Sequence, residues 1–160
     1  HSVEDMNNTI INNINSTVGP GDILLHLGDW SFGGKENIKV ARDRIICNNI
    51  IVLPGNHHSG MRDDKELQKP FLAVADYLEF RVGKNLICCF HYPIIDWNEK
   101  NRGSLMLSGH SHQLTNKFEH GKHLNVGLEA NFMKPWNLVE ILDIMKLVPV
   151  KNDHHNGTRQ

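Results

Sequence analysis

The sequence predicts an α/β domain, and two patterns along the chain carry that prediction. In the first half, amphipathic helical segments alternate with short apolar strands, whereas the second half consists mostly of strand-like segments. This combination indicates an α/β core that continues into a largely antiparallel or mixed sheet. The chain has 160 residues without an internal repeat or a linker-like stretch. We therefore assign residues 1–150 to one domain and residues 151–160 to a polar tail.

The first half is predicted to hold two helices and two strands. A capping pair, Ser2 and Asp5, precedes apolar residues at helical spacing. A Gly-Pro-Gly-Asp turn follows at residues 19–22, and two short apolar runs are typical of strands buried on both faces. The predicted elements are a helix over 2–18, a strand over 23–27, a helix over 35–47 with Ile38, Ala41, Ile45 and Ile46 inward, and a strand over 50–53.

The second half is predicted to be mainly strands. Apolar and β-branched runs flank turn residues such as Gly83-Lys84-Asn85 and His120-Gly121. Cys88 and Cys89 alternate across one strand, so we expect them on opposite faces. The predicted elements are a short helix over 63–69, strands over 77–82, 86–90 and 105–107, a hairpin of 117–119 with 123–126, and a final strand over 138–144.

Composition and charge exclude several classes of protein. Seventeen basic and 18 acidic residues leave a net charge of −1, which argues against nucleic acid as a default partner and leaves it only as a possible substrate. No apolar run reaches the length of a membrane span. The three cysteines form no CxxC pair, which favours a reducing, cytoplasmic setting. Any metal site must therefore be built from His, Asp and Asn.

Four of the predicted strands end in polar clusters that bear metal-ligating side chains. They supply Asp29, Asn56 with His57, His91, and His110 with His112, and glycine precedes three of the four clusters. Ligands of open α/β sheets bind at the carboxyl ends of strands, so these side chains are expected to converge there. A carboxylate, a carboxamide and three imidazoles suit a two-metal site, a known device for phosphoester hydrolysis. His57 is placed to act as a general acid.

The ordered motifs GD, GNH, H and GHxH resemble those of the calcineurin-like metallophosphoesterases. Here they are Gly28-Asp29, Gly55-Asn56-His57, His91 and Gly109-His110-Ser111-His112, and the segments V-G-P-G-D-I-L-L-H-L-G-D-W-S-F-G and N-V-G-L-E-A-N add to the similarity. The resemblance spans residues 1 to about 140 and looks closest to the small single-domain enzymes of phages and bacteria.

The resemblance implies a fold, a site and a chemistry. The fold would be a two-sheet β-sandwich flanked by helices. Asp29 would bridge two divalent metals (Mn, Fe, Zn or Ni, with Mn favoured), Asn56, His91 and His110 would complete one of them, and His112 would serve the other. Asn56 and His57 would bind substrate, and His57 would protonate the leaving group while a metal-bound hydroxide attacks a phosphomonoester or phosphodiester.

The chain departs from the family pattern in two places. No D-x-H motif lies upstream of Asp29, so we expect an N-terminal strand of some two dozen residues to be missing. His58 stands where the family usually has an acidic residue. The absent D-x-H also motivates an alternative function, a scaffold of the same fold with little or no activity.

A few further side chains have less specific expectations. Trp30 and Phe32 either line a substrate pocket or pack in the core, and His120 and His123 are expected at the surface. Arg62 and Arg102 lie near motif loops and are candidate phosphate binders, but their spacing alone does not favour that role. Neither the substrate nor the oligomeric state follows from these residues.

Overall fold

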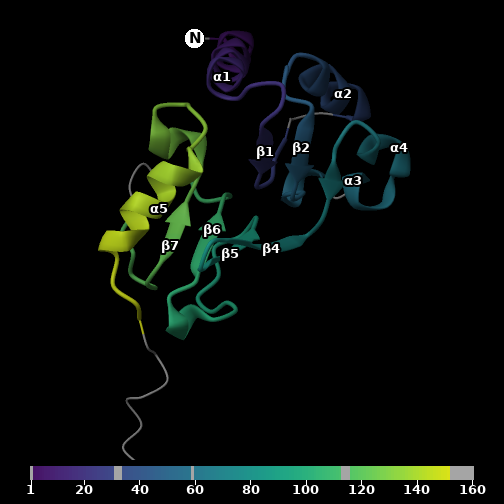
Figure 1. Cartoon of the computed structure of the whole chain (residues 1–160). Helices are drawn as coiled ribbons and strands as arrows, with labels where there is room; N and C mark the ends of the chain where they lie inside the picture. Colours follow the sequence, from purple (N-terminus) through teal and green to yellow (C-terminus); the bar gives the residue numbers. More distant parts are fainter. Residues whose placement is uncertain (1, 31–33, 59, 113–115, 152–160) are drawn as a thin grey trace, which may run out of the picture.

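Two β-sheets form the framework of the protein in a computed structural model that describes residues 2–30, 34–58, 60–112 and 116–151 (Figure 1). One sheet is parallel, in the order β1 (Ile23–His26), β2 (Asn49–Val52) and β3 (Ala73–Val74). The other is mixed, in the order β4 (Tyr77–Val82), β5 (Asn85–Phe90), β6 (Leu105–Ser108) and β7 (His123–Asn125), and only the β4–β5 pair is antiparallel. The predicted α/β class with a mixed second sheet is confirmed. The predicted missing strand, the tail beyond Lys151, and Phe32 lie outside the described residues.

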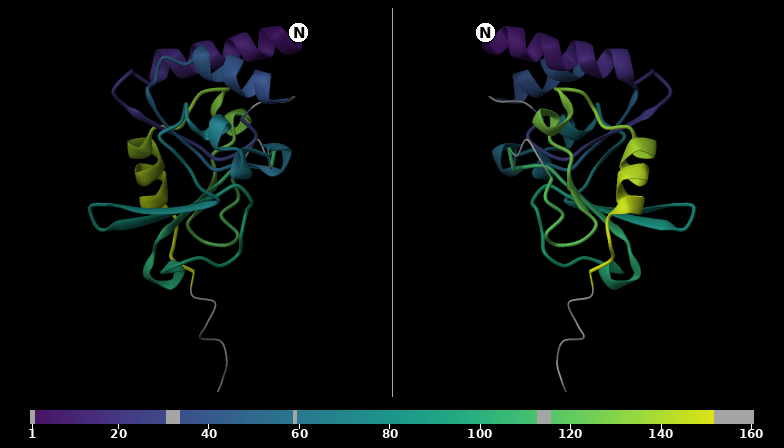
Figure 2. Two further views of the ribbon diagram at one scale, coloured as in Figure 1. Left: turned by 90° about the vertical axis from the view of Figure 1, so that its right-hand side faces the viewer. Right: turned by 90° about the vertical axis from the view of Figure 1, so that its left-hand side faces the viewer.

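Alternate residues of the strands face different apolar layers. Leu24, Ile50 and Val52 pack with helices α1 (Val3–Thr17) and α2 (Lys35–Asp43) on the outer face of the parallel sheet. Leu25 and Ile51 face inward, against apolar residues of the mixed sheet and helix α5 (Leu138–Leu147). Figure 2 shows α1 and α5 as separate covers of the framework. The strands are therefore buried on both faces because each face meets its own apolar layer.

Most of the predicted elements of the first half are confirmed, but α2 is shorter than expected. The Ser2–Asp5 capping box starts α1 as predicted. Helix α2 ends at Asp43, and Ile46 is 48% exposed rather than inward. The Arg42 guanidinium donates to the carbonyls of Ile45 and Pro70, so a side chain satisfies backbone oxygens beyond the helix end.

The helix predicted over residues 63–69 is two short helices, α3 (Gly60–Asp63) and α4 (Lys65–Gln68). Asp64 separates them because its carboxylate accepts hydrogen bonds from the backbone N–H groups of Glu66 and Leu67, which caps α4.

The final strand predicted over residues 138–144 is wrong, because this segment is helix α5. Asn137 and Glu140 form a capping box at its start. The core-facing residues Leu138, Ile141, Leu142 and Met145 recur at helical spacing. Periodicity alone does not distinguish a short buried strand from a buried helix. Here the capping box of Asn137 and Glu140 favours the helix.

The predicted hairpin around His120-Gly121 is also wrong. Residues 117–119 are not a strand, and β7 pairs in parallel with β6. The side-chain amide of Asn116 contacts Asn125 in place of a neighbouring strand: its oxygen accepts from the Asn125 N–H at 2.6 Å, and its nitrogen donates to the Asn125 carbonyl at 3.2 Å. A carboxamide thus satisfies the backbone at the open edge of β7.

Cys88 and Cys89 are both fully buried, one in each apolar layer of the mixed sheet, as the strand alternation predicts. Burial raises the pKa of the Cys89 thiol to about 12. Among the described residues, no helix combines the length and apolar character that crossing a bilayer requires.

Candidate metal centre

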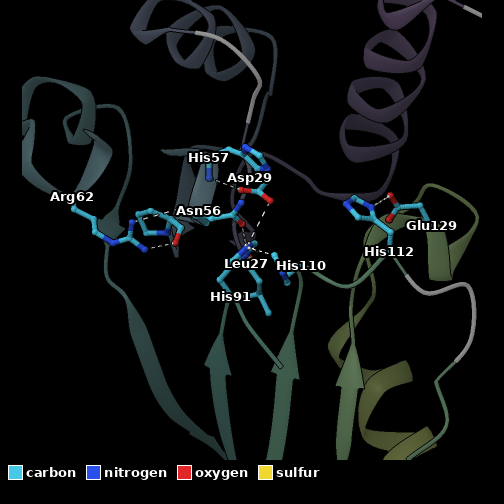
Figure 3. Close-up of polar contacts among 11 residues, drawn as sticks. Leu27, Asp29, Asn56, His57, Arg62, His91, His110, His112 and Glu129 are labelled. Carbon is cyan, nitrogen blue, oxygen red and sulfur yellow. Dashed lines mark hydrogen bonds and ion pairs between the residues drawn. The ribbon is translucent and has the colours of Figure 1, made fainter. Parts of the chain in front are cut away.

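Four of the predicted ligands converge at one point between the two sheets (Figure 3). Asp29 follows β1, Asn56 follows β2, His91 follows β5 and His110 follows β6. One ligand atom from each of Asp29, His91 and His110 lies within 4.8 Å of the others. The Asn56 Oδ1 atom lies 3.1 Å from His91 Nε2. The carboxyl ends of strands from both sheets therefore build a single cluster.

The protonation of His91 follows from its buried contact with the backbone. His91 is 1% exposed, and its Nδ1 lies 2.7 Å from the Leu27 carbonyl oxygen, which can only accept a hydrogen bond. Nδ1 must then carry the proton, which leaves a lone pair on Nε2 when the ring is neutral. A backbone carbonyl that holds one ring nitrogen is the usual support of a metal-binding histidine.

The lone pair of His91 faces three potential ligand atoms. Nε2 lies 3.1 Å from Asn56 Oδ1, 3.2 Å from His110 Nδ1 and 3.7 Å from Asp29 Oδ2. The two side-chain oxygens repel this lone pair unless a proton or a cation lies between them, whereas His110 Nδ1 donates or accepts according to its tautomer. Two imidazoles, a carboxylate and a carboxamide oxygen match the ligand preferences of Mn, Fe, Zn and Ni, so the residues present fit a divalent cation.

The backbone at two of these ligands adopts a conformation that is uncommon for residues with a side chain. Asp29 has φ +53° and His110 has φ +59°. The left-handed region costs a non-glycine residue energy, and such positions concentrate at functional sites. The chain therefore turns sharply where Asp29 and His110 enter the cluster.

Glycines allow the close approach of the strand ends, as their place before three of the four motifs predicts. A Cβ atom on Gly28 would lie 1.9 Å from His91 Nδ1, and one on Gly55 would lie 2.2 Å from Asp29 Oδ1. A Cβ atom on Gly109 would lie 2.8 Å from the Leu27 carbonyl oxygen. Gly28 and Gly55 thus leave space for the candidate ligands His91 and Asp29, and Gly109 leaves space for the Leu27 carbonyl that contacts His91.

His57 lies beside the cluster. Its backbone N–H donates to Asp29 Oδ1 at 3.3 Å, so residue 57 helps to orient the carboxylate. Its side chain is exposed, and its role as an acid stays a prediction.

His112 lies outside the group of converging ligand atoms and contacts a residue that motif spacing did not single out. Its Nδ1 is 2.8 Å from Glu129 Oε1, and Figure 3 shows the pair to one side of the His91 cluster. Burial favours a raised pKa for Glu129, but the hydrogen bond and the charge of His112, together with a backbone hydrogen bond, outweigh it and the pKa is lowered. His112 as a ligand of a second cation stays a prediction.

The other candidate residues are mainly structural. Trp30 is buried and its Nε1 donates to the Ile38 carbonyl, so it packs in the core. Arg62 pairs with Asp76 and donates to the Pro54 carbonyl.

His120 is exposed as expected, but the surface placement of His123 is wrong. His123 is half-buried and its Nε2 lies 2.7 Å from the buried Ser108 hydroxyl. Burial and the neighbouring His120 lower the pKa of His123 to about 4.

Sequence reasoning missed two partners of the site. The Leu27 carbonyl is a backbone group and has no sequence signature. Glu129 lies within the N-V-G-L-E-A-N segment, and that segment was the available signal.

Comparisons with known proteins bear on the fold alone. No family model and no curated protein matches this chain. The crystal structure of a protein of unknown function from Aquifex aeolicus is similar, with a TM-score of 0.66 and 24% sequence identity over 89% of this chain and 87% of that chain. The two-sheet α/β architecture therefore occurs in a solved structure.

Proposed function

We propose that this protein is a metal-dependent hydrolase of phosphate esters with a calcineurin-like metallophosphoesterase fold. The observation that carries the proposal is the convergence of Asp29, Asn56, His91 and His110 from four strand ends. The lone pair of His91 faces the other three ligands across 3.1 to 3.7 Å. Their order along the chain and the two-sheet framework support the family assignment.

These residues would hold one divalent cation, and His112 together with Asp29 would hold a second. Bound divalent cations supply positive charge to the phosphate oxygens and make hydroxide available near neutral pH. Other groups of the protein hold the candidate ligands in position. Leu27 holds the His91 ring and its proton in place, and the His57 N–H orients the Asp29 carboxylate.

The exposed imidazole of His57 is the group we assign to proton donation. Its backbone contacts the Asp29 carboxylate, so the ring starts at the solvent edge of the cluster. A proton delivered there stabilises the departing oxygen of the ester.

A second candidate function is an inactive scaffold of the same fold. The position of His112 favours it, because His112 is not among the converging ligand atoms of the described residues. A scaffold of this kind would hold at most one cation and turn over no phosphate ester.

Metal binding and hydrolysis together test the proposal. The chain is loaded with Mn²⁺, desalted and analysed for metal per chain, and then assayed with p-nitrophenyl phosphate and bis(p-nitrophenyl) phosphate. We expect Mn²⁺-dependent hydrolysis that Asp29→Asn and His91→Ala abolish, while the exposed-histidine variant His120→Ala retains it. Circular dichroism identifies unfolding of the buried His91 variant, and Asp29→Asn keeps the side-chain shape. Unchanged hydrolysis in both site variants would refute the proposal, and bound Mn²⁺ without turnover would favour the scaffold.

A further inference from the structure

His91 and His112 share a hydrogen-bonding arrangement although the first is buried and the second is exposed. The Nδ1 atom of His91 contacts the Leu27 carbonyl at 2.7 Å, and the Nδ1 atom of His112 contacts the Glu129 carboxylate at 2.8 Å. An ionised carboxylate can only accept a hydrogen bond, so Nδ1 of His112 carries a proton. In both rings Nε2 is left as the potential ligand atom.

His112 needs such a partner more than His91 does. The His112 side chain is 78% exposed, whereas that of His91 is 2% exposed and held by its surroundings. A freely rotating exposed imidazole loses rotamer and tautomer freedom when it binds an ion. A carboxylate that fixes the ring beforehand reduces that loss.

Glu129 is itself held in place relative to the His112 loop. The buried carboxamide of Asn125 links the two segments: its oxygen accepts from the Gly127 N–H at 2.9 Å, and its nitrogen donates to the Ser111 carbonyl. Ser111 directly precedes His112, and Gly127 begins the short 3-10 turn that contains Glu129. The His112–Glu129 contact is therefore supported by the framework, unlike a contact between two long mobile side chains.

The turn at Gly127 also leaves space for the carboxylate. A Cβ atom on Gly127 would lie 3.3 Å from Glu129 Oε2 and 3.1 Å from Asn125 Oδ1. Both separations are tighter than ordinary contacts, so glycine at this position allows the carboxylate and the carboxamide to pack over the turn.

We propose that Glu129 is a positioning residue that fixes His112 in the Nδ1–H tautomer and leaves its Nε2 atom to bind the second cation. This inference rests on the proposed function. Glu129 acts through His112, and Asn125 holds the two segments in register.

The test separates the tautomer from metal binding. Long-range ¹H–¹⁵N spectra of the metal-free chain, above the pKa of the ring, report which nitrogen of His112 is protonated. We expect Nδ1–H in the wild type and in Glu129→Gln, whose amide oxygen still accepts, and loss of that preference in Glu129→Ala. Glu119→Ala, at an exposed glutamate on the loop that follows His112, is the matched control and should leave the spectrum unchanged.

Calorimetric Mn²⁺ titration supplies the second readout. We expect the weaker of two binding steps to lose ~10–100-fold in affinity in Glu129→Ala, with the tighter step unchanged and partial rescue in Glu129→Gln. The inference is overturned if His112 shows the same tautomer behaviour with and without Glu129, or if the variants bind both ions as the wild type does. If the wild type binds no Mn²⁺, the proposed function is wrong as well. A His112 tautomer that still depends on Glu129 would show in that case that the positioning contact itself exists.

Discussion

Replacing Gly55 with alanine offers a direct test of where Asp29 must lie. The added Cβ atom would stand 2.2 Å from Asp29 Oδ1 and 2.8 Å from the Asp29 backbone nitrogen. Ordinary contacts begin at 3.4 Å, so the carboxylate oxygen would have to move by about 1.2 Å. Ligand distances in metal sites vary by only ~0.2 Å, so this displacement removes Asp29 from any cation that it binds.

The expected loss is larger in metal affinity than in stability. Inserting a methyl group into a packed site costs ~1–3 kcal/mol of unfolding free energy. Displacing a ligand should lower Mn²⁺ affinity at least ~10-fold, which corresponds to ~1.4 kcal/mol of binding free energy. The Asp29 side chain is 21% exposed, so its carboxylate can swing outward, whereas the 2.8 Å approach to the Asp29 backbone nitrogen requires a small backbone shift as well.

Calorimetric Mn²⁺ titration and urea denaturation measure the two effects separately. Gly21→Ala is the matched control, because a Cβ atom there meets nothing within 4 Å. If Gly55→Ala binds Mn²⁺ as tightly as Gly21→Ala and the wild type, Asp29 is not a ligand and the placement of the metal site is wrong.

Three further predictions concern the fold around the site. Asn137→Ala removes the cap of α5 and should lower the unfolding free energy by ~1 kcal/mol in urea denaturation, whereas an unchanged value would argue against the capped helix. Asn125→Ala leaves two partly buried backbone groups without this partner, and we expect a loss of ~1–3 kcal/mol in the same assay; a neutral result would show that the carboxamide does not link the two segments. Because folding lowers the pKa of His123 from 6.5 to about 4, the unfolded chain binds the proton more readily between these values. The stability associated with a neutral His123 should thus be complete above pH about 6.5 and decline as the pH falls toward 4. The wild type should lose more stability than His123→Gln across this range, and parallel pH profiles would contradict the reasoning.

Local sequence patterns predicted the elements that depend on neighbouring residues. The capping box and apolar spacing of α1 are contained in one short segment, as is the alternation of Cys88 and Cys89. The same reasoning failed for α5, because an apolar run of this length suits a buried strand or a buried helix. It also failed for residues 117–119, where the side chain of Asn116 takes the place of a strand.

The candidate site likewise combines local features that the sequence predicts with distant contacts that it does not. The sequence by itself determined which residue types follow the strands, and that glycines precede them, because both are local features of strand ends. Only the tertiary structure decided that Leu27 holds His91, a contact across 64 positions, and that His112 meets Glu129 rather than the His91 cluster. Such contacts depend on how two sheets and their loops pack, and the spacing of residues along one strand carries no information about the distance between sheets.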